Sequence, residues 1–180
     1  VKMIKAMAAP YSMMKFIPTG GINANNLNDY LSFDKIIACG GSWMVNEALI
    51  KEGKFDEITK LARQAVQQML GFELIHVGVN CADRDEAGAA ADRYAKLFGF
   101  EKKVGNSSTF AGTVIEAMHG VGLGKMGHIG LRTNYLERAV SYLENMGVEF
   151  IEESKKYNAK GGLQVIYLKE EIGGFAVHLV

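Results

Sequence analysis

A near-repeat in the second half of the chain most constrains its fold. The segment FELIHVGVN (72–80) aligns with KMGHIGLRT (125–133), and TVIEAMHG (113–120) aligns with GFAVHLV (174–180). In each half, the first aligned segment is followed by a helix-type segment, a glycine that ends it and strand-type segments, and then by the second aligned segment. Self-similarity of this kind predicts one supersecondary unit used twice. We therefore expect a duplicated module whose order is strand, helix and three strands, written βαβββ.

The two modules are predicted over 72–120 and 125–180. In the first, the helix-type segment DEAGAAADRYAKLFGF is closed by Gly99; in the second, YLERAVSYLENMGVEF is closed by Gly147. Paired edge to edge, the two modules predict an α+β domain over 72–180.

The first part of the chain has a different pattern. Each of the strand-type segments KFIPTGG and DKIIACGG ends in a glycine pair and precedes a helix-type segment, NANNLNDYLS or SWMVNEALI. Short apolar strands that alternate with helices are typical of parallel α/β sheets and barrels. The sequence FDEITKLARQAVQQML then predicts an amphipathic helix. We expect an α/β segment over 1–53, a linking helix over 54–71, and the duplicated domain after it.

Composition excludes several classes of protein. Twenty Lys and Arg balance twenty Asp and Glu, and no run of like charge could follow a phosphate backbone, so nucleic acid is not an expected partner. No apolar stretch approaches the roughly 20 residues of a membrane span. Cys39 and Cys81 lack metal-type spacing, which favours a reducing compartment and a cytoplasmic protein. The chain opens with Val1 rather than Met, so we expect a fragment of a longer protein.

The glycine pairs are the candidate site of the first segment. Glycine lets backbone amides approach an anion closely, and a helix N-terminus behind each pair adds positive partial charge. Thr19 and Ser42 supply hydroxyl groups beside Gly20, Gly21, Gly40 and Gly41. From spacing alone, a phosphate site and two ordinary tight turns both remain open.

The words FIPTGGIN and GGSW, with Pro10 ahead of them, resemble the closing two strands of the 2-keto-3-deoxy-6-phosphogluconate and 4-hydroxy-2-oxoglutarate aldolase family. The resemblance covers about residues 1–70. It implies a trimeric eight-stranded TIM-type barrel that cleaves its substrate through a Schiff base between a lysine and pyruvate. It also implies that Thr19 contacts the pyruvyl group, and that the substrate phosphate is held by Gly20, Gly21, Gly40, Gly41 and Ser42.

The chain departs from this family in its catalytic residues. The family's Schiff-base lysine lies in a KLFPA-like motif on the preceding strand, and its acid/base glutamate lies earlier; neither stretch is present. Lys2, Lys5 and Lys15 do not match that motif. Two strands of eight cannot close a barrel. We therefore expect no aldolase activity from this chain alone, and no catalytic residue in it, whereas the parent protein would be a lyase.

The repeat also aligns ligand-type side chains. His76 and His128 occupy one equivalent position, and Glu116 and His178 occupy another. If the modules pair into one curved sheet, these four converge near the pseudo-two-fold axis. Imidazoles with one carboxylate suit Zn, Ni, Fe or Mn with open positions for a ligand. His119 has no repeat partner, and we interpret it as a loop histidine.

The words IHVGV, GHIGL and VIEAM resemble the vicinal oxygen chelate superfamily, which includes glyoxalase I, methylmalonyl-CoA epimerase and extradiol dioxygenases. The resemblance implies metal ligands on the first, fourth, fifth and eighth strands. His76, Glu116 and His128 match, whereas His178 stands where glutamate is usual. This exchange removes one negative charge, which strengthens the metal as a Lewis acid and weakens the last ligand as a proton acceptor.

Together these features predict the C-terminal part of a bifunctional protein. An aldolase that acts on phosphorylated sugar acids would be fused to a metal-binding, glyoxalase-like domain that takes an oxygen-rich ligand such as a 2-oxo acid. The aldolase resemblance also implies a homo-oligomer. Two alternatives remain: a metal-free binding or oligomerisation module, and a stand-alone glyoxalase-like metalloenzyme.

Overall fold

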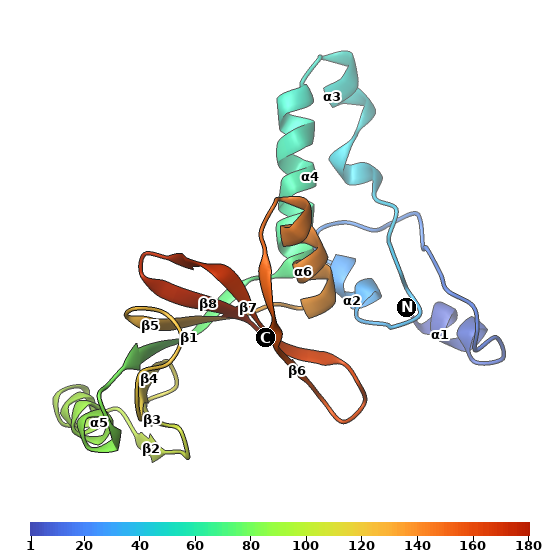
Figure 1. The fold of residues 1–180 in the computed structure, drawn as a ribbon. Coiled ribbons are helices and arrows are strands. Elements are labelled where there is room, and N and C mark those ends of the chain that lie inside the picture. Colours follow the sequence, from blue (N-terminus) through green and yellow to red (C-terminus); the bar gives the residue numbers. More distant parts are fainter. The chain divides into compact units, whose positions relative to one another are not determined.

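A computed structural model describes residues 1–180 and divides them into two compact units (Figure 1). We call Val1–Gly71 the N-terminal domain and Phe72–Val180 the C-terminal domain. No helix in either domain is both long and apolar enough to cross a membrane.

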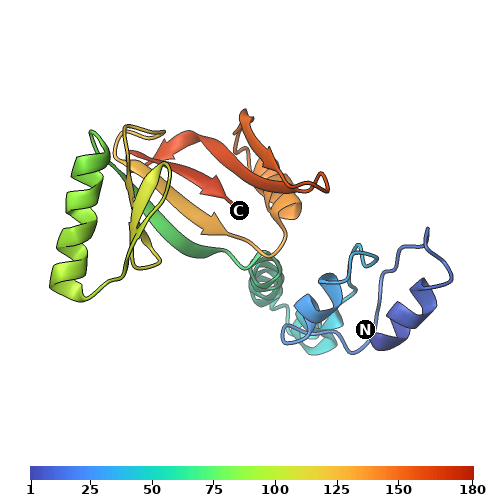
Figure 2. The same ribbon diagram turned by 90° about the horizontal axis from the view of Figure 1, so that it is seen from below.

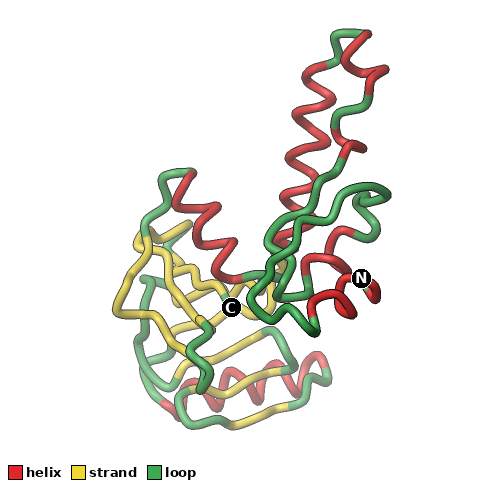
Figure 3. Tube along the Cα trace, turned by 90° about the vertical axis from the view of Figure 1, so that its right-hand side faces the viewer, coloured by secondary structure: helices red, strands yellow, loops and turns green.

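The N-terminal domain consists of short helices, one longer helix and loops (Figure 3). Its longest element, α4, is the amphipathic helix expected from the sequence, and Gly71 ends it in the left-handed conformation (φ 56°). Asn28 in α2 donates from its side chain to the carbonyl of Gln68 in α4, which ties these two helices together. In chain order the elements are α1 (Lys2–Ala8), α2 (Leu27–Leu31), the 3-10 helix η1 (Ser42–Met44), α3 (Glu47–Lys51) and α4 (Phe55–Leu70).

The two strands expected in this domain are reduced to a single parallel bridge between Phe16 and Ile36. The Phe16 amide donates to the carbonyl of Lys35, and the Ile37 amide donates back to Phe16. Pro18 has no amide hydrogen to continue the pairing. Gly20 and Gly21 then adopt positive φ, and the chain turns away from the bridge. The expectation of two full βα units is therefore wrong for the strands, although the parallel direction is as predicted.

The helix expected over SWMVNEALI is interrupted. Val45 leaves the helical region (φ −130°, ψ 73°) between η1 and α3. Asn46 then caps α3, because its side-chain oxygen accepts from the Leu49 amide at 3.0 Å. An asparagine that caps from the N-terminal side starts a helix rather than continuing one.

The C-terminal domain is an eight-stranded mixed sheet that curves through the domain (Figure 2). The order strand, helix and three strands occurs twice along the chain. Across the sheet, the strand order is β2-β3-β4-β1-β5-β8-β7-β6, so the two halves meet at β1 and β5. The elements are β1 (Glu73–Asn80), α5 (Arg84–Phe98), β2 (Lys102–Val104), β3 (Ser108–Ala111), β4 (Ile115–Met118), β5 (Gly127–Arg132), α6 (Leu136–Asn145), β6 (Phe150–Tyr157), β7 (Leu163–Ile172) and β8 (Phe175–Leu179).

The register of the central strands has a pseudo-two-fold relation. In the antiparallel pair of β1 and β5, His76 lies opposite Gly130, and Gly78 lies opposite His128. Each glycine also pairs with an outer neighbour in parallel, Gly78 with Glu116 on β4 and Gly130 with His178 on β8. The pairing thus places equivalent residues of the two modules at equivalent positions in the sheet.

Two helices cover the apolar face of this sheet, α5 against β3 and β4, and α6 against β7. Alanines at 87, 91 and 139 are fully buried, which lets both helices approach the strands closely. Asp83 caps α5 by accepting from two backbone amides, and Gly99 ends the helix with φ 71°. The opposite face of the sheet carries the candidate site.

Candidate metal centre

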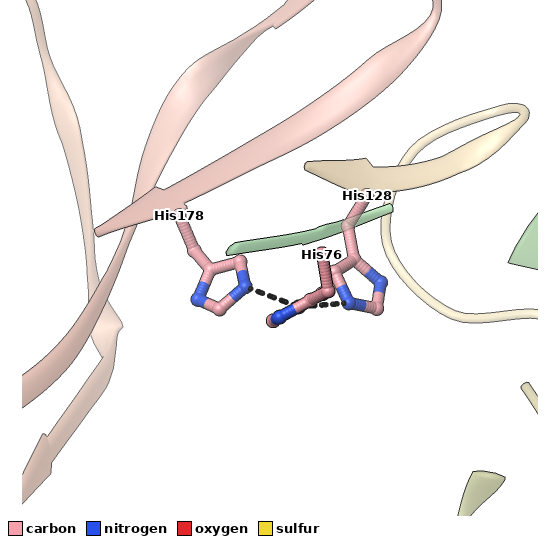
Figure 4. Close-up of side chains that lie close together, drawn as sticks. All are labelled: His76, His128 and His178. Atoms are coloured by element: carbon pink, nitrogen blue, oxygen red, sulfur yellow. Dashed lines mark hydrogen bonds between the residues drawn. The ribbon is translucent and has the colours of Figure 1, made fainter. Parts of the chain in front are cut away.

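The four central strands of the sheet each contribute one donor side chain. Glu116 comes from β4, His76 from β1, His128 from β5 and His178 from β8, in the order in which these strands lie side by side. Figure 4 shows the three imidazoles turned toward one another. The four side chains that the repeat predicted to converge therefore lie close together in the structure.

His76 lies at the centre of this cluster. Its Nε2 atom is 3.0 Å from His128 Nε2 and 3.0 Å from His178 Nε2 (Figure 4). Glu116 Oε2 is 3.5 Å from the same atom and 3.2 Å from His128 Nε2. A neutral imidazole nitrogen carries either one hydrogen or one lone pair. It therefore cannot satisfy three polar neighbours at once, whereas a cation bound by converging lone pairs would satisfy them all.

Glycines at two positions make room for the imidazoles. A Cβ atom at Gly78 would lie 2.0 Å from His128 Cε1, and a Cβ atom at Gly130 would lie 2.4 Å from His76 Cε1. Neither distance is physically possible without movement. The rings of His76 and His128 thus lie across the backbone of the opposite strand, where only glycine fits.

Three further side chains support the four donors. Ser108 donates its hydroxyl to Glu116 Oε1 at 2.6 Å, which leaves Oε2 toward the imidazoles. Phe110 packs edge-on against His76, with ring centroids 6.2 Å apart. Tyr167 stacks on His178 at 4.8 Å and 20°. Phe110 pairs with Glu116 and Tyr167 pairs with His178 in the sheet, so the two aromatic rings are also related by the duplication.

Electrostatics favour the neutral imidazole at His76 and His178 and the ionised carboxylate at Glu116. Burial lowers the pKa of His76; the Glu116 carboxylate opposes this shift and His128 adds to it. Burial, then His76 and His128, lowers the pKa of His178 to about 4. Burial would raise the pKa of Glu116, but hydrogen bonds from His128 and Ser108 outweigh it and hold the pKa below its usual value. At neutral pH His76 and His178 therefore offer neutral nitrogens, and Glu116 offers an ionised oxygen, which are the forms that bind a metal.

The Nδ1 atom of His178 is buried without a hydrogen-bond partner in the protein. Metal-bound histidines commonly donate from their second ring nitrogen to a carboxylate or carbonyl. Here the ring is held by its stack on Tyr167 instead. His119, by contrast, has both ring nitrogens occupied, by Thr109 Oγ1 at 2.8 Å and the Asn106 carbonyl at 3.2 Å, which fits the expected loop histidine.

The predicted phosphate-binding residues of the N-terminal domain lie in two loops that approach each other. The Gly40 amide donates to the Pro18 carbonyl, and a Cβ at Gly40 would lie 2.9 Å from Thr19 Cγ2. The ring of Trp43 lies against Gly41, and Ser42 begins η1. Gly20 and Gly21 adopt positive φ with open space around them. Phosphate binding at these loops stays a prediction.

The sequence interpretation missed five residues that support the candidate metal centre. It placed none of Gly78, Ser108, Phe110, Gly130 and Tyr167 at the donor cluster. One signal for the glycines was available, because the pattern His-x-Gly occurs in both modules, at 76–78 and 128–130. Nothing in the sequence alone points to Ser108 or Tyr167, since their roles depend on the sheet register.

Comparison with known proteins separates the two domains. Residues 1–61 match the KDPG and KHG aldolase family. The chain is 48% identical over 66 residues to the 2-dehydro-3-deoxy-phosphogluconate aldolase of Haemophilus influenzae, covering 37% of this chain and 31% of that enzyme. It is 46% identical over 67 residues to the KHG/KDPG aldolase of Escherichia coli K12, covering 37% and 32%. The predicted aldolase resemblance is confirmed, and the chain spans about a third of the length of these relatives.

The rest of the chain structurally resembles methylmalonyl-CoA epimerase, of the vicinal oxygen chelate fold. The Mycobacterium tuberculosis epimerase covers 62% of this chain and 88% of its own length, with 17% identity and a TM-score of 0.42. A hypothetical protein of Bacillus halodurans covers 60% and 92%, with 14% identity and a TM-score of 0.43. At such low identity, what those proteins bind does not transfer to this chain.

Proposed function

We propose that the C-terminal domain binds one divalent metal ion through His76, Glu116, His128 and His178. The observation that carries this proposal is the convergence of three Nε2 atoms and one carboxylate oxygen from four adjacent strands. The donor set fits the ion, because neutral imidazoles and one carboxylate suit Zn, Ni, Fe or Mn. Chelating neighbouring oxygens of a small acid and polarising them is the chemistry that such an ion supplies.

The surrounding residues define what the site itself contributes. Ser108 fixes the Glu116 carboxylate with a short hydrogen bond, so only its second oxygen faces the imidazoles. Phe110 packs edge-on against His76, and Tyr167 stacks on His178, so each of these imidazoles has an aromatic neighbour. Burial, and then the charge of Glu116, raises the pKa of Tyr167, which keeps its hydroxyl protonated at neutral pH. The protein side of the site therefore carries one negative charge.

Metal analysis tests the proposal directly. The full chain, incubated in turn with Zn²⁺, Ni²⁺, Fe²⁺ and Mn²⁺ and dialysed against metal-free buffer, is expected to retain close to one ion per chain. His76→Ala and His128→Ala should lose it while circular dichroism shows the fold retained. His119→Ala is the matched control, because that imidazole lies outside the cluster.

Absence of metal from the unaltered chain under all four conditions would refute the proposed metal-binding function. It would favour the alternative of a metal-free binding or oligomerisation module. Retention of the ion in His76→Ala would equally contradict the assignment, because His76 Nε2 is the atom that all other donors approach.

For the N-terminal domain, we infer that it supplies the pyruvate and phosphate end of an aldolase site in a larger lyase. The family match and the approach of the Thr19 and Gly40 loops support this inference. The Schiff-base motif of the family is not among these 180 residues. Borohydride reduction in the presence of pyruvate should therefore leave Lys2, Lys5 and Lys15 unmodified by mass spectrometry; a pyruvyl adduct on any of them would refute the inference.

A further inference from the structure

The two oxygens of the Glu116 carboxylate have different surroundings. Oε2 faces the imidazoles, at 3.2 Å from His128 Nε2 and 3.5 Å from His76 Nε2. Oε1 accepts a 2.6 Å hydrogen bond from the hydroxyl of Ser108. An ion that bound both oxygens would have to displace this hydroxyl from Oε1. The hydrogen bond therefore presents one oxygen of Glu116 to the cluster and occupies the other.

Ser108 is held in place by the sheet around it. The residue is only 5% exposed, and it lies opposite Met118 on β4 in the antiparallel pairing. Its carbonyl accepts from the Gly105 amide at 2.8 Å. The Glu116 side chain is itself only 14% exposed, so water has little access to the carboxylate. The hydroxyl is thus a fixed partner of Oε1 rather than one of several exchanging donors.

The second module provides an internal comparison, because it has no equivalent hydroxyl. In β3, Ser108 comes two residues before the residue opposite Glu116. In β7, Val165 comes two residues before the residue opposite His178. The imidazole of His178 directs one atom, Nε2, at the cluster, and its Nδ1 atom has no partner. The hydroxyl therefore accompanies only the donor residue that could offer an ion two atoms on the same side.

Whether a carboxylate offers one oxygen or two changes which ion a site prefers. With one oxygen from Glu116, the four residues offer three nitrogens and one oxygen. Few ligands that are rich in imidazole suit Zn²⁺. Mn²⁺ prefers oxygen ligands and a larger number of them. A second oxygen from the same carboxylate would therefore help Mn²⁺ more than Zn²⁺.

We propose that Ser108 determines metal selection, because it restricts Glu116 to one donor oxygen and so widens the preference for Zn²⁺ over Mn²⁺. This inference rests on the metal site of the proposed function and narrows the range of ions that the site takes. Ser108 is a positioning residue in this assignment, since it acts through Glu116 and does not itself bind the ion.

The test compares the affinities of the full chain and of Ser108→Ala for Zn²⁺ and Mn²⁺. Zn²⁺ is titrated against a chromophoric chelator, and free Mn²⁺ is measured by its electron paramagnetic resonance signal. Sites with nitrogen ligands generally prefer Zn²⁺ to Mn²⁺, so the readout is the change in the ratio of the two dissociation constants.

Ser108→Ala is expected to weaken Zn²⁺ binding by about tenfold or more, which is the scale of a lost supporting contact. Mn²⁺ binding should stay unchanged or become tighter, because the freed Oε1 atom compensates for the lost support. The preference for Zn²⁺ should therefore shrink by about tenfold or more. Ser108→Cys, whose thiol is a weak donor, should shift the ratio in the same direction and repeats the test if alanine disturbs the fold.

Ser107→Ala is the matched control, because the neighbouring serine is exposed. It should leave both affinities unchanged. A second comparison removes the Ser108 hydroxyl from a Glu116→Gln chain, whose side-chain amide has a single oxygen. In that chain the ratio should not change, since no second oxygen can be freed. Circular dichroism compares the fold of every variant with that of the unaltered chain.

The outcomes separate this inference from the proposed function. An unchanged ratio in Ser108→Ala would overturn the role of Ser108 while leaving the metal centre intact, because a merely structural hydroxyl would affect both ions equally. A change in ratio that persists in the Glu116→Gln chain would also overturn it. If the unaltered chain binds neither ion, the metal site itself fails and this inference fails with it.

Discussion

Replacing Gly130 by alanine should disable the metal centre without touching a ligand. The added Cβ would lie 2.4 Å from His76 Cε1, 2.7 Å from His76 Nε2 and 2.8 Å from His178 Nε2. Gly130 does not adopt positive φ, so the strand backbone accepts alanine and the only cost is steric. Carbon atoms in contact need about 3.5–4.0 Å, so the His76 ring must move by about 1 Å.

The size of the effect follows from that displacement. Metal-ligand distances tolerate only about 0.2 Å of change, and mutations of supporting residues alone commonly cost about 10- to 100-fold in metal affinity. A shift of about 1 Å in the central ligand should therefore weaken metal binding by about 100-fold or more. Overpacking should lower the free energy of unfolding of the metal-free chain by about 1–3 kcal/mol.

The assay combines competitive metal titration with urea unfolding of the metal-free protein. Gly88→Ala is the matched control, because a Cβ there meets only Lys102 Nζ at an ordinary 3.8 Å. In the interior of α5 it should stabilise the domain by about 1 kcal/mol and leave metal affinity unchanged. Unaltered metal affinity in Gly130→Ala would refute the reasoning, since it would mean that the His76 ring does not lie across this glycine.

Three further perturbations test other parts of the domain. Asp83→Ala removes the acceptor for the Asp85 and Glu86 amides and should lower the free energy of unfolding by about 1 kcal/mol in urea titrations; no change would mean that water replaces the cap. In the metal-free chain, the unfolded state protonates His178 near its ordinary pKa of 6.5, whereas the folded state does so at about 4. Stability is therefore complete above about pH 6.5 and falls as the pH drops toward 4, by about 3 kcal/mol at most, and a flat pH profile would contradict this. Burial, then Glu86 and Asp83, raises the pKa of Cys81, so its thiol should react with a disulfide reagent at pH 7.5 far more slowly in the folded than in the urea-unfolded chain.

The sequence was most informative where the chain repeats itself. The alignment of the two modules was sufficient to predict that His76, Glu116, His128 and His178 meet, because equivalent positions in a paired duplication converge on its axis. It could not identify Ser108 or Tyr167, since each contacts its partner only through a particular strand register. Register is set by many cooperating contacts along the sheet, and no single residue encodes it.

The N-terminal domain shows the opposite case. The segments around Phe16 and Ile36 have strand-type composition, and the prediction gave each a full strand. Strand length depends on hydrogen-bonding partners as well as on side chains. Here each segment has one neighbour, and Pro18 has no amide hydrogen to donate to it. Its carbonyl still accepts from the Gly40 amide, but only one bridge pair forms.

The pairing of β1 with β5 has a consequence for the order of the two modules along the chain. Val180 exchanges backbone hydrogen bonds with the end of β5, at Leu131 and Thr133, and the start of β1 lies opposite Arg132. The last residue of one module therefore lies close to the first residue of the other. A circularly permuted domain, opened between β4 and β5 and rejoined from 180 to 72 by a short linker, would keep every strand pair. The donor cluster needs both modules, because each contributes two of its four side chains. It does not depend on which module comes first in the chain.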